Sequence, residues 1–247
     1  MLTLVSIACL GFFLGMRHAT DADHVIAVST IVSRERAVRS AVLIGALWGL
    51  GHTLTLLLVG GAIVFFGLVI PPRLGMSMEF SVGLMLILLG VWNLKSFGKW
   101  LDSQGHSIAE SHSGEFHSHS HSHHSEDHRP ASHWLDRHFG KLPLYQTVRP
   151  FVVGIVHGMA GSAALALMVL PMIHNPIWAM TYLGIFGVGT IAGMMLITGA
   201  IAWPFAYTVA RSKTLHGRLA LASGLLSLGF GIFMIYEIGI VQGLLAK

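Results

Sequence analysis

The sequence predicts an all-α polytopic membrane protein with six transmembrane helices arranged as a 3+3 inverted repeat. Three observations lead to this prediction. Of the 247 residues, 53% are hydrophobic and only 11% are charged, whereas a soluble domain carries about 25% charged residues. Six apolar stretches approach or exceed the roughly 20 residues that a membrane-spanning helix needs. The two halves of the chain also resemble each other in sequence.

The six apolar stretches are residues 3–31, 39–69, 78–99, 149–173, 177–209 and 218–245. Only helices satisfy every backbone group in lipid over such lengths. The longest stretches exceed what a straight crossing needs, which implies helices that tilt, kink or extend beyond the hydrocarbon core.

A polar insert, residues 102–140, separates the third stretch from the fourth. It is rich in histidine and serine and reads HSHSHSHHSEDH over residues 117–128. A segment of this composition cannot bury a core, so we expect it to be disordered and to bind metal weakly and reversibly. The chain then divides into a first three-helix repeat (1–101), this loop (102–140) and a second three-helix repeat (141–247).

The basic residues predict the orientation. Twelve of the fifteen lysines and arginines lie in the connectors that follow the first, third and fifth stretches. Connectors rich in Lys and Arg stay on the cytoplasmic side, so we expect the histidine-rich loop inside and both termini outside, in a bacterial inner membrane. Because these charges sit in short connectors, they do not indicate nucleic-acid binding. The single cysteine, Cys9, excludes an intrachain disulfide and a multi-cysteine metal site.

The internal repeat is visible without gaps. GLGHTLTLLLVGGAI (49–63) aligns with GVGTIAGMMLITGAI (187–201), and SVGLMLILLGVWNL (81–94) aligns with ASGLLSLGFGIFMI (222–235). His18 similarly falls opposite His157 in the second half, at nearly the same spacing. Chance alignment of glycine-rich apolar helices is the alternative. Three spans per half is an odd number, so the second half would enter the membrane from the opposite side, an arrangement that places a substrate site near the midplane.

The chemistry concentrates in RHATDADH, residues 17–24. Ionisable groups in the middle of a membrane span are costly and therefore usually functional. At about 100° per residue, His18, Asp21 and His24 fall within about 120° of one face, and Asp23 falls on the other side. Imidazole and carboxylate ligands suit nickel, cobalt or zinc, so we predict a metal site. Asp23 would join it if the helix unwinds here. A self-neutralised polar cluster that only holds helices together is the alternative.

Two further histidines are candidate ligands. His52 lies in the middle of the second stretch, and His157 lies in the fourth at the position equivalent to His18. A single buried histidine is usually only hydrogen-bonded, but a neighbouring metal site favours ligand roles for both. The predicted metal residues are therefore His18, Asp21, Asp23, His24, His52 and His157.

RHATDADHVIAV closely resembles the signature of the nickel/cobalt transporter (NiCoT) family, RHA-x-DADHI, and GHT at 51–53 resembles the GHS element of that family. HGMAGSAAL, which begins at His157, looks like the urease-accessory, UreH-like branch. The resemblance covers all six stretches. It implies uptake of nickel or cobalt, with His18, Asp21, Asp23, His24 and His52 at matched positions, and it suggests nickel-enzyme maturation factors as partners.

These features predict a secondary permease for Ni²⁺ or Co²⁺ rather than an enzyme, with the metal as transported ion and no cofactor. No G-x-x-x-x-G-K-[ST] phosphate loop is present, so membrane potential or a proton gradient would drive transport. Three alternatives remain. They are an efflux permease, a metal-delivery factor for a nickel enzyme such as urease, and an intramembrane metallohydrolase, for which the HExxH motif is missing.

Overall fold

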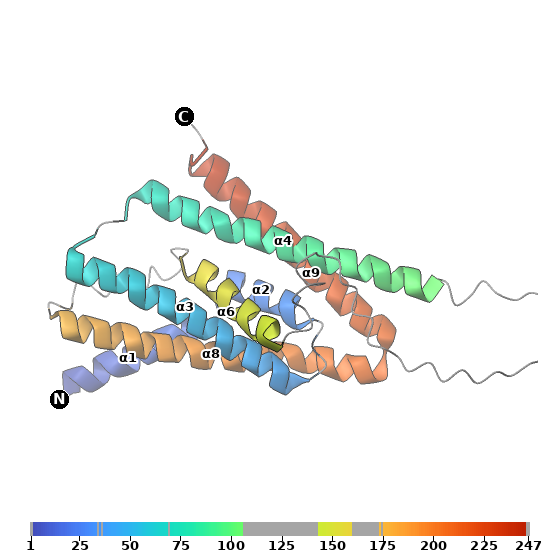
Figure 1. Cartoon of the computed structure of the whole chain (residues 1–247), viewed down its shortest axis with the longest axis horizontal. Helices are drawn as coiled ribbons and strands as arrows, with labels where there is room; N and C mark the ends of the chain where they lie inside the picture. The colour runs from blue at the N-terminus through green and yellow to red at the C-terminus, as the bar shows by residue number, and fades with distance from the viewer. Residues whose placement is uncertain are drawn as a thin grey trace, which may run out of the picture.

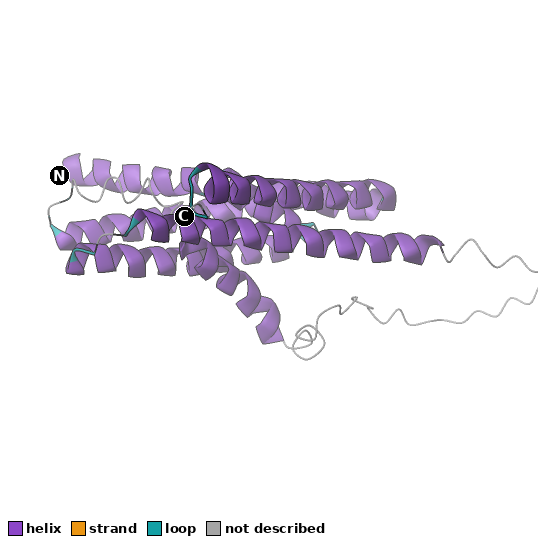
Figure 2. Ribbon diagram, turned by 90° about the horizontal axis from the view of Figure 1, so that it is seen from above, coloured by secondary structure: helices purple, strands orange, loops and turns teal. Residues whose placement is uncertain are grey.

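The computed structural model describes residues 2–33, 35, 37–68, 70–105, 143–159, 173 and 175–245, and its regular structure there is entirely helical (Figure 2). This confirms the predicted all-α class. In chain order the elements are α1 (Leu2–His18), α2 (Ala22–Val32), α3 (Val38–Phe66), α4 (Pro72–Gly105), α6 (Pro143–Met159), α8 (Pro176–Arg211), α9 (Lys213–Tyr236) and the π-helical turn η3 (Glu237–Val241).

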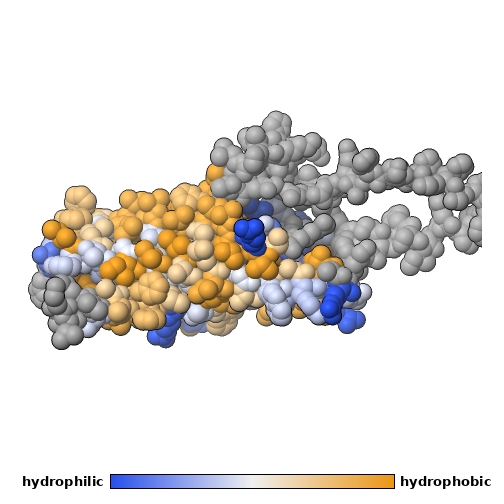
Figure 3. All heavy atoms as spheres, turned by 90° about the horizontal axis from the view of Figure 1, so that it is seen from below, coloured by the Kyte–Doolittle hydropathy of each residue, from blue (hydrophilic) through white to orange (hydrophobic). Residues whose placement is uncertain are grey.

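Four segments of the described chain are long and apolar enough to cross a membrane: Val38–Phe66, Pro72–Gly98, Pro176–Val209 and Thr214–Val241. Large apolar side chains are exposed along them, including Leu58, Leu88 and Leu196. The face seen in Figure 3 is covered mainly by apolar residues, with strongly hydrophilic ones in a few isolated places. Such a surface fits lipid rather than water, as expected of a polytopic membrane protein.

The first predicted span differs from expectation. A single helix over residues 3–31 was predicted, but two shorter helices, α1 of 17 residues and α2 of 11, stand there instead. The fourth predicted span is described only as α6, of 17 residues. The described part of the chain therefore has four candidate spans rather than six. The predicted polar insert also begins later, because α4 continues to Gly105; residues 106–140, with the loop histidines, lie outside the described residues.

The helices pack in pairs (Figure 1). α3 lies along α8, α1 packs on α8, and α6 packs on α3. α4 packs along α9, and the short α2 contacts α4, α8 and α9. α2 therefore links the α4–α9 pair to the remaining helices.

Two glycines allow the closest helix crossings. A methyl group on Gly15 of α1 would overlap the carbonyl oxygen of Phe186 in α8, and one on Gly154 of α6 would overlap the carbonyl oxygen of Trp48 in α3. Backbones that approach this closely tolerate only a small residue. His18 and His157 each follow their glycine by three residues, so these crossings bring one histidine of each half against the middle of α3 and α8.

Hydrogen bonds fix the far end of α2. The side-chain amide of Asn93 in α4 donates to Ser33 Oγ at 3.2 Å and to Ser223 Oγ at 3.1 Å. Thr30 donates to the carbonyl oxygen of Ser223 in α9, at 3.2 Å. Buried polar groups are stable only when they are paired in this way. The network anchors α2 at its C-terminal end and leaves its N-terminal end pointing at α1, α3 and α6.

Candidate metal centre

The centre forms where the first apolar segment breaks. α1 ends at His18 and α2 begins at Ala22, with Asp21 in an extended conformation (φ −60°, ψ 145°) between them. A tight turn closes the break, because the amides of Thr20 and Asp21 donate to the carbonyls of Arg17 and His18. Thr20 Oγ1 also donates to the carbonyl of Arg17. Short polar side chains compete with helical hydrogen bonding in this way, which explains why the helix stops inside an apolar segment.

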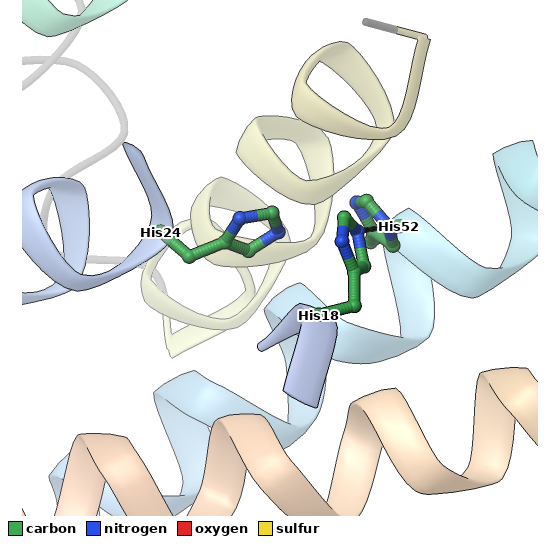
Figure 4. Close-up of side chains that lie close together, drawn as sticks. All are labelled: His18, His24 and His52. Atoms are coloured by element: carbon green, nitrogen blue, oxygen red, sulfur yellow. Dashed lines mark hydrogen bonds between the residues drawn. The ribbon is translucent and has the colours of Figure 1, made fainter. Parts of the chain in front are cut away.

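The first group of candidate ligands contains three histidines from three helices: His18 of α1, His24 of α2 and His52 of α3. All three are buried, and one ligand atom from each lies within 4.8 Å of the other two. Nε2 of His18 is 3.1 Å from Nε2 of His52. The ring of His24 lies with its edge toward the other two rings (Figure 4).

The second group contains Asp23 and His24 of α2 and His157 of α6. Oδ1 of Asp23 lies 3.1 Å from Nδ1 of His24, and its Oδ2 lies 3.1 Å from Nε2 of His157. The same Nε2 of His157 is 3.3 Å from Nδ1 of His24. This group therefore joins the two halves of the chain, and its carboxylate side chain is only 12% exposed.

Asp21 lies outside both groups. Its Oδ2 is 2.8 Å from Nδ1 of His18, and its side chain is 39% exposed. The placement of Asp21 between the histidines, with Asp23 on the far side, assumed one continuous helix, and the break makes that assumption wrong. Its contact with Nδ1 of His18 leaves the Nε2 of that ring facing His52, an arrangement that carboxylates commonly have beside metal-binding histidines.

The separations between these nitrogens match those of a metal site. Two nitrogens bound to one ion at about 2.0–2.1 Å lie roughly 2.9–3.4 Å apart. The pair His18–His52, at 3.1 Å, and the pair His24–His157, at 3.3 Å, both fall in this range. Four fully buried imidazoles within reach of one another, with one buried carboxylate, form a donor set that suits borderline divalent cations.

Several nitrogens of the centre have no hydrogen-bond partner among the described residues. They are Nε2 of His24, Nδ1 of His52 and Nδ1 of His157, all buried. A buried polar atom without a partner costs free energy, so its retention calls for an explanation. The Nε2 of His24 belongs to a residue shared by both groups, so it is a free donor atom at the point where the two groups of candidate ligands meet.

Two aromatic residues that the sequence analysis missed enclose the centre. The indole ring of Trp48 stacks on His24 at 6.2 Å between centroids and meets His157 edge-on at 5.6 Å. The ring of Phe186 lies 5.7 Å from that of His18. The internal repeat carried a signal for this pair, because Trp48 and Phe186 immediately precede the aligned segments 49–63 and 187–201 and are therefore equivalent. Both are buried, and each covers part of the imidazole cluster.

Comparison with known proteins gives two matches. A family model described as high-affinity nickel-transport protein (NicO) matches residues 4–213. The urease accessory protein UreH of Bacillus sp. (strain TB-90) is 35% identical over 241 residues, which cover 98% of this chain and 95% of that protein. No solved structure matches the chain.

Proposed function

The chain belongs to the high-affinity nickel-transport protein family, as the resemblance indicated, and from this premise we propose that it is a secondary permease that takes up Ni²⁺ or Co²⁺. One observation carries the proposal. Buried imidazoles from α1, α2, α3 and α6 converge with the carboxylate of Asp23 in the interior of an apolar, lipid-compatible helix bundle. Charged and imidazole groups at that depth are costly unless they serve a substrate pathway. The cation is the transported substrate, and we expect no cofactor and no catalysis.

We propose that His18, Asp23, His24, His52 and His157 bind the ion and that Asp21 positions His18. The break between α1 and α2 supports this assignment, because discontinuous helices form ion sites in many secondary transporters. Asp23 also lies in the first turn of α2, where the unpaired backbone amides stabilise its negative charge.

The predicted six-helix, 3+3 inverted repeat remains the arrangement we propose, with repeats at 1–101 and 141–247 and the loop between them. Paired close contacts support it. A methyl group on Gly51 would overlap the carbonyl oxygen of Phe151, and one on Gly189 would overlap that of Phe12. Gly51 and Gly189 are equivalent in the gapless alignment, and Phe12 and Phe151 have the same spacing as His18 and His157. Each half therefore approaches the other through equivalent residues.

In this arrangement the ion binds between the halves, and rocking of one against the other exposes the centre to each side in turn. An inside-negative potential favours inward movement of a divalent cation by about 4.6 kcal/mol per 100 mV. The positive-inside distribution supports a cytoplasmic position for the histidine-rich loop in a bacterial cell, where it would take up the delivered metal.

A second candidate function is delivery of nickel to an enzyme without transport. The relative named as a urease accessory protein favours it. Nickel-enzyme maturation factors would be the partners in that case, and the same centre would hold the ion.

Radionickel flux into vesicles separates these functions. Purified protein in proteoliposomes with an inside-negative potential should accumulate ⁶³Ni²⁺, and His18→Ala and Asp23→Asn should reduce the rate to that of empty liposomes. Whole cells that express the wild type should also gain nickel. Binding without flux would support delivery instead, and lower nickel in expressing cells would support efflux. Equal flux in the wild type and both variants would refute the proposed centre.

A further inference from the structure

We propose that the ion occupies two successive positions that share His24, one formed with His18 and His52 and one formed with Asp23 and His157. The inference rests on the proposed transport function and describes how the ion passes through the centre. It starts from the membership of His24 in both groups of candidate ligands.

The two ring nitrogens of His24 face different groups. Nδ1 lies 3.1 Å from Asp23 and 3.3 Å from His157. Nε2 is buried without a hydrogen-bond partner among the described residues, and a ring nitrogen of His24 points toward His18 and His52 (Figure 4). The nitrogens of one imidazole diverge, so a single ion binds through only one of them. His24 therefore cannot complete both groups around the same ion.

The distances between the rings also fit two positions, because two candidate ligands of different groups lie farther apart than those within a group. The rings of His18 and His52 lie 5.0 Å apart and those of His24 and His157 lie 4.2 Å apart, whereas His52 and His157 are 6.1 Å apart. Each group is compact, and His24 lies between them. An ion that moves between the positions exchanges His18 and His52 for Asp23 and His157 and keeps one imidazole throughout.

The two positions differ in charge and in origin. The first offers three imidazoles, all from the first half of the chain. The second combines His24 with the carboxylate of Asp23, also from the first half, and with His157 from the second half. A carboxylate attracts a divalent cation more strongly than an imidazole does. Movement to the second position therefore carries the ion to the boundary between the halves. Several moderate sites also let an ion both enter and leave, which one strong site would prevent.

Ni²⁺ binding to selected variants tests the two positions. All samples carry serine at the ten loop histidines, so that the loop binds no nickel. His52→Gln should keep only the position with Asp23 and His157, and His157→Gln only the position with His18 and His52. Each variant should bind one Ni²⁺ by equilibrium dialysis, and X-ray absorption should detect at most two imidazoles in His52→Gln and three in His157→Gln.

A second substitution should then weaken Ni²⁺ binding in only one of these two variants. Asp23→Asn should weaken Ni²⁺ binding at least about tenfold in His52→Gln and leave it unchanged in His157→Gln, and His18→Gln should show the reverse pattern. Equal losses in both backgrounds would mean a single site and would overturn the proposal. So would failure of either single variant to bind nickel while it remains monodisperse. Asn variants replace any Gln variant that aggregates.

Flux gives the final criterion. Both His52→Gln and His157→Gln should bind nickel yet lose ⁶³Ni²⁺ uptake, because the ion must pass through both positions. Uptake at the wild-type rate in either variant would overturn the proposal that the ion passes through both positions. If the variants show the expected binding pattern but the wild-type protein transports no nickel, only the proposed transport function is refuted.

Discussion

The two halves of the molecule cross their neighbours in the same way but carry different chemistry. α1 meets α8 at Gly15, α6 meets α3 at Gly154, and a buried histidine follows each glycine by three residues. The backbone frame around the centre is thus the same on both sides. A frame of this kind sets the depth of one imidazole in each half and leaves the remaining side chains free to differ.

The side chains differ at two places. Asp21 and Asp23 follow His18 in the first half, whereas the residues after His157 are Gly158 and Met159. His52 in α3 corresponds to Thr190 in α8, whose hydroxyl only donates to its own helix, at the carbonyl of Phe186. The first half therefore supplies most of the candidate ligands, and the second supplies one histidine, His157, which contacts Asp23 and His24 of the first half. Substitutions at equivalent positions of the two halves should therefore differ in their effects.

The largest effect should come from Asp23, the carboxylate that joins the halves. Asp23→Asn should lower ⁶³Ni²⁺ uptake by more than about 100-fold, because loss of a ligand costs more than the 10–100-fold typical of a supporting residue. Asp21→Asn, the matched control, should stay within that 10–100-fold range. A larger loss for Asp21→Asn than for Asp23→Asn would reverse the roles assigned to the two carboxylates.

The next effect compares equivalent positions in α3 and α8. His52→Gln should lower uptake by about 100-fold or more, since it removes an imidazole from the centre. Thr190→Val keeps the branched shape at the equivalent position and should change uptake less than about twofold, because the lost hydroxyl donates its hydrogen bond to a carbonyl of its own helix. Both rates are measured in the same proteoliposomes. Similar losses in the two variants would contradict the asymmetry between the halves.

Stability should depend on the shared frame. Gly15→Ala should lower the stability of the purified protein by roughly 1–3 kcal/mol, because its methyl group overlaps the backbone of α8. Gly184→Ala, where no described atom lies within 4 Å of an added Cβ, should be neutral or stabilising by up to about 1 kcal/mol. Thermal unfolding in detergent measures both. Equal melting temperatures would show that α1 and α8 are not in backbone contact.

The smallest effect should come from the aromatic wall formed by Trp48 and Phe186. Trp48→Leu should weaken Ni²⁺ binding by about 2- to 12-fold, which corresponds to the roughly 0.5–1.5 kcal/mol of an aromatic contact. Trp203→Leu is the control, because Trp203 is 65% exposed and lies away from the histidines, stacked on Tyr207. Dialysis against ⁶³Ni²⁺ measures both. Unchanged Ni²⁺ binding in Trp48→Leu would show that Trp48 does not contribute to the centre.

The long helices could be predicted from the sequence because composition decides them. Predicted stretches at 39–69, 78–99, 177–209 and 218–245 correspond to α3, α4, α8 and α9 with shifted ends. The candidate ligands could also be predicted from the sequence, because ionisable groups inside apolar segments are costly and usually functional. Five of them, all except Asp21, belong to the two groups that the structure brings together.

The break at residues 19–21 could not be predicted from periodicity. Its cause is local competition by the Thr20 hydroxyl and the turn amides for carbonyls that a helix would use. A helical wheel carries no such information, so it assigned Asp21 and Asp23 to the wrong faces. The aromatic wall was missed for another reason. Trp48 and Phe186 look like ordinary packing residues until the helix crossings place them against the imidazoles.

The central claim is that the buried imidazoles and the carboxylate of Asp23 bind a dehydrated nickel ion. His24 tests it most directly because it belongs to both groups of candidate ligands. The measurement is Ni²⁺ titration calorimetry on purified protein with serine at the loop histidines, comparing the wild-type centre with His24→Gln. We predict one saturable site in the former and none in the latter, while both proteins stay monodisperse. Equal nickel binding by the two proteins would contradict the account.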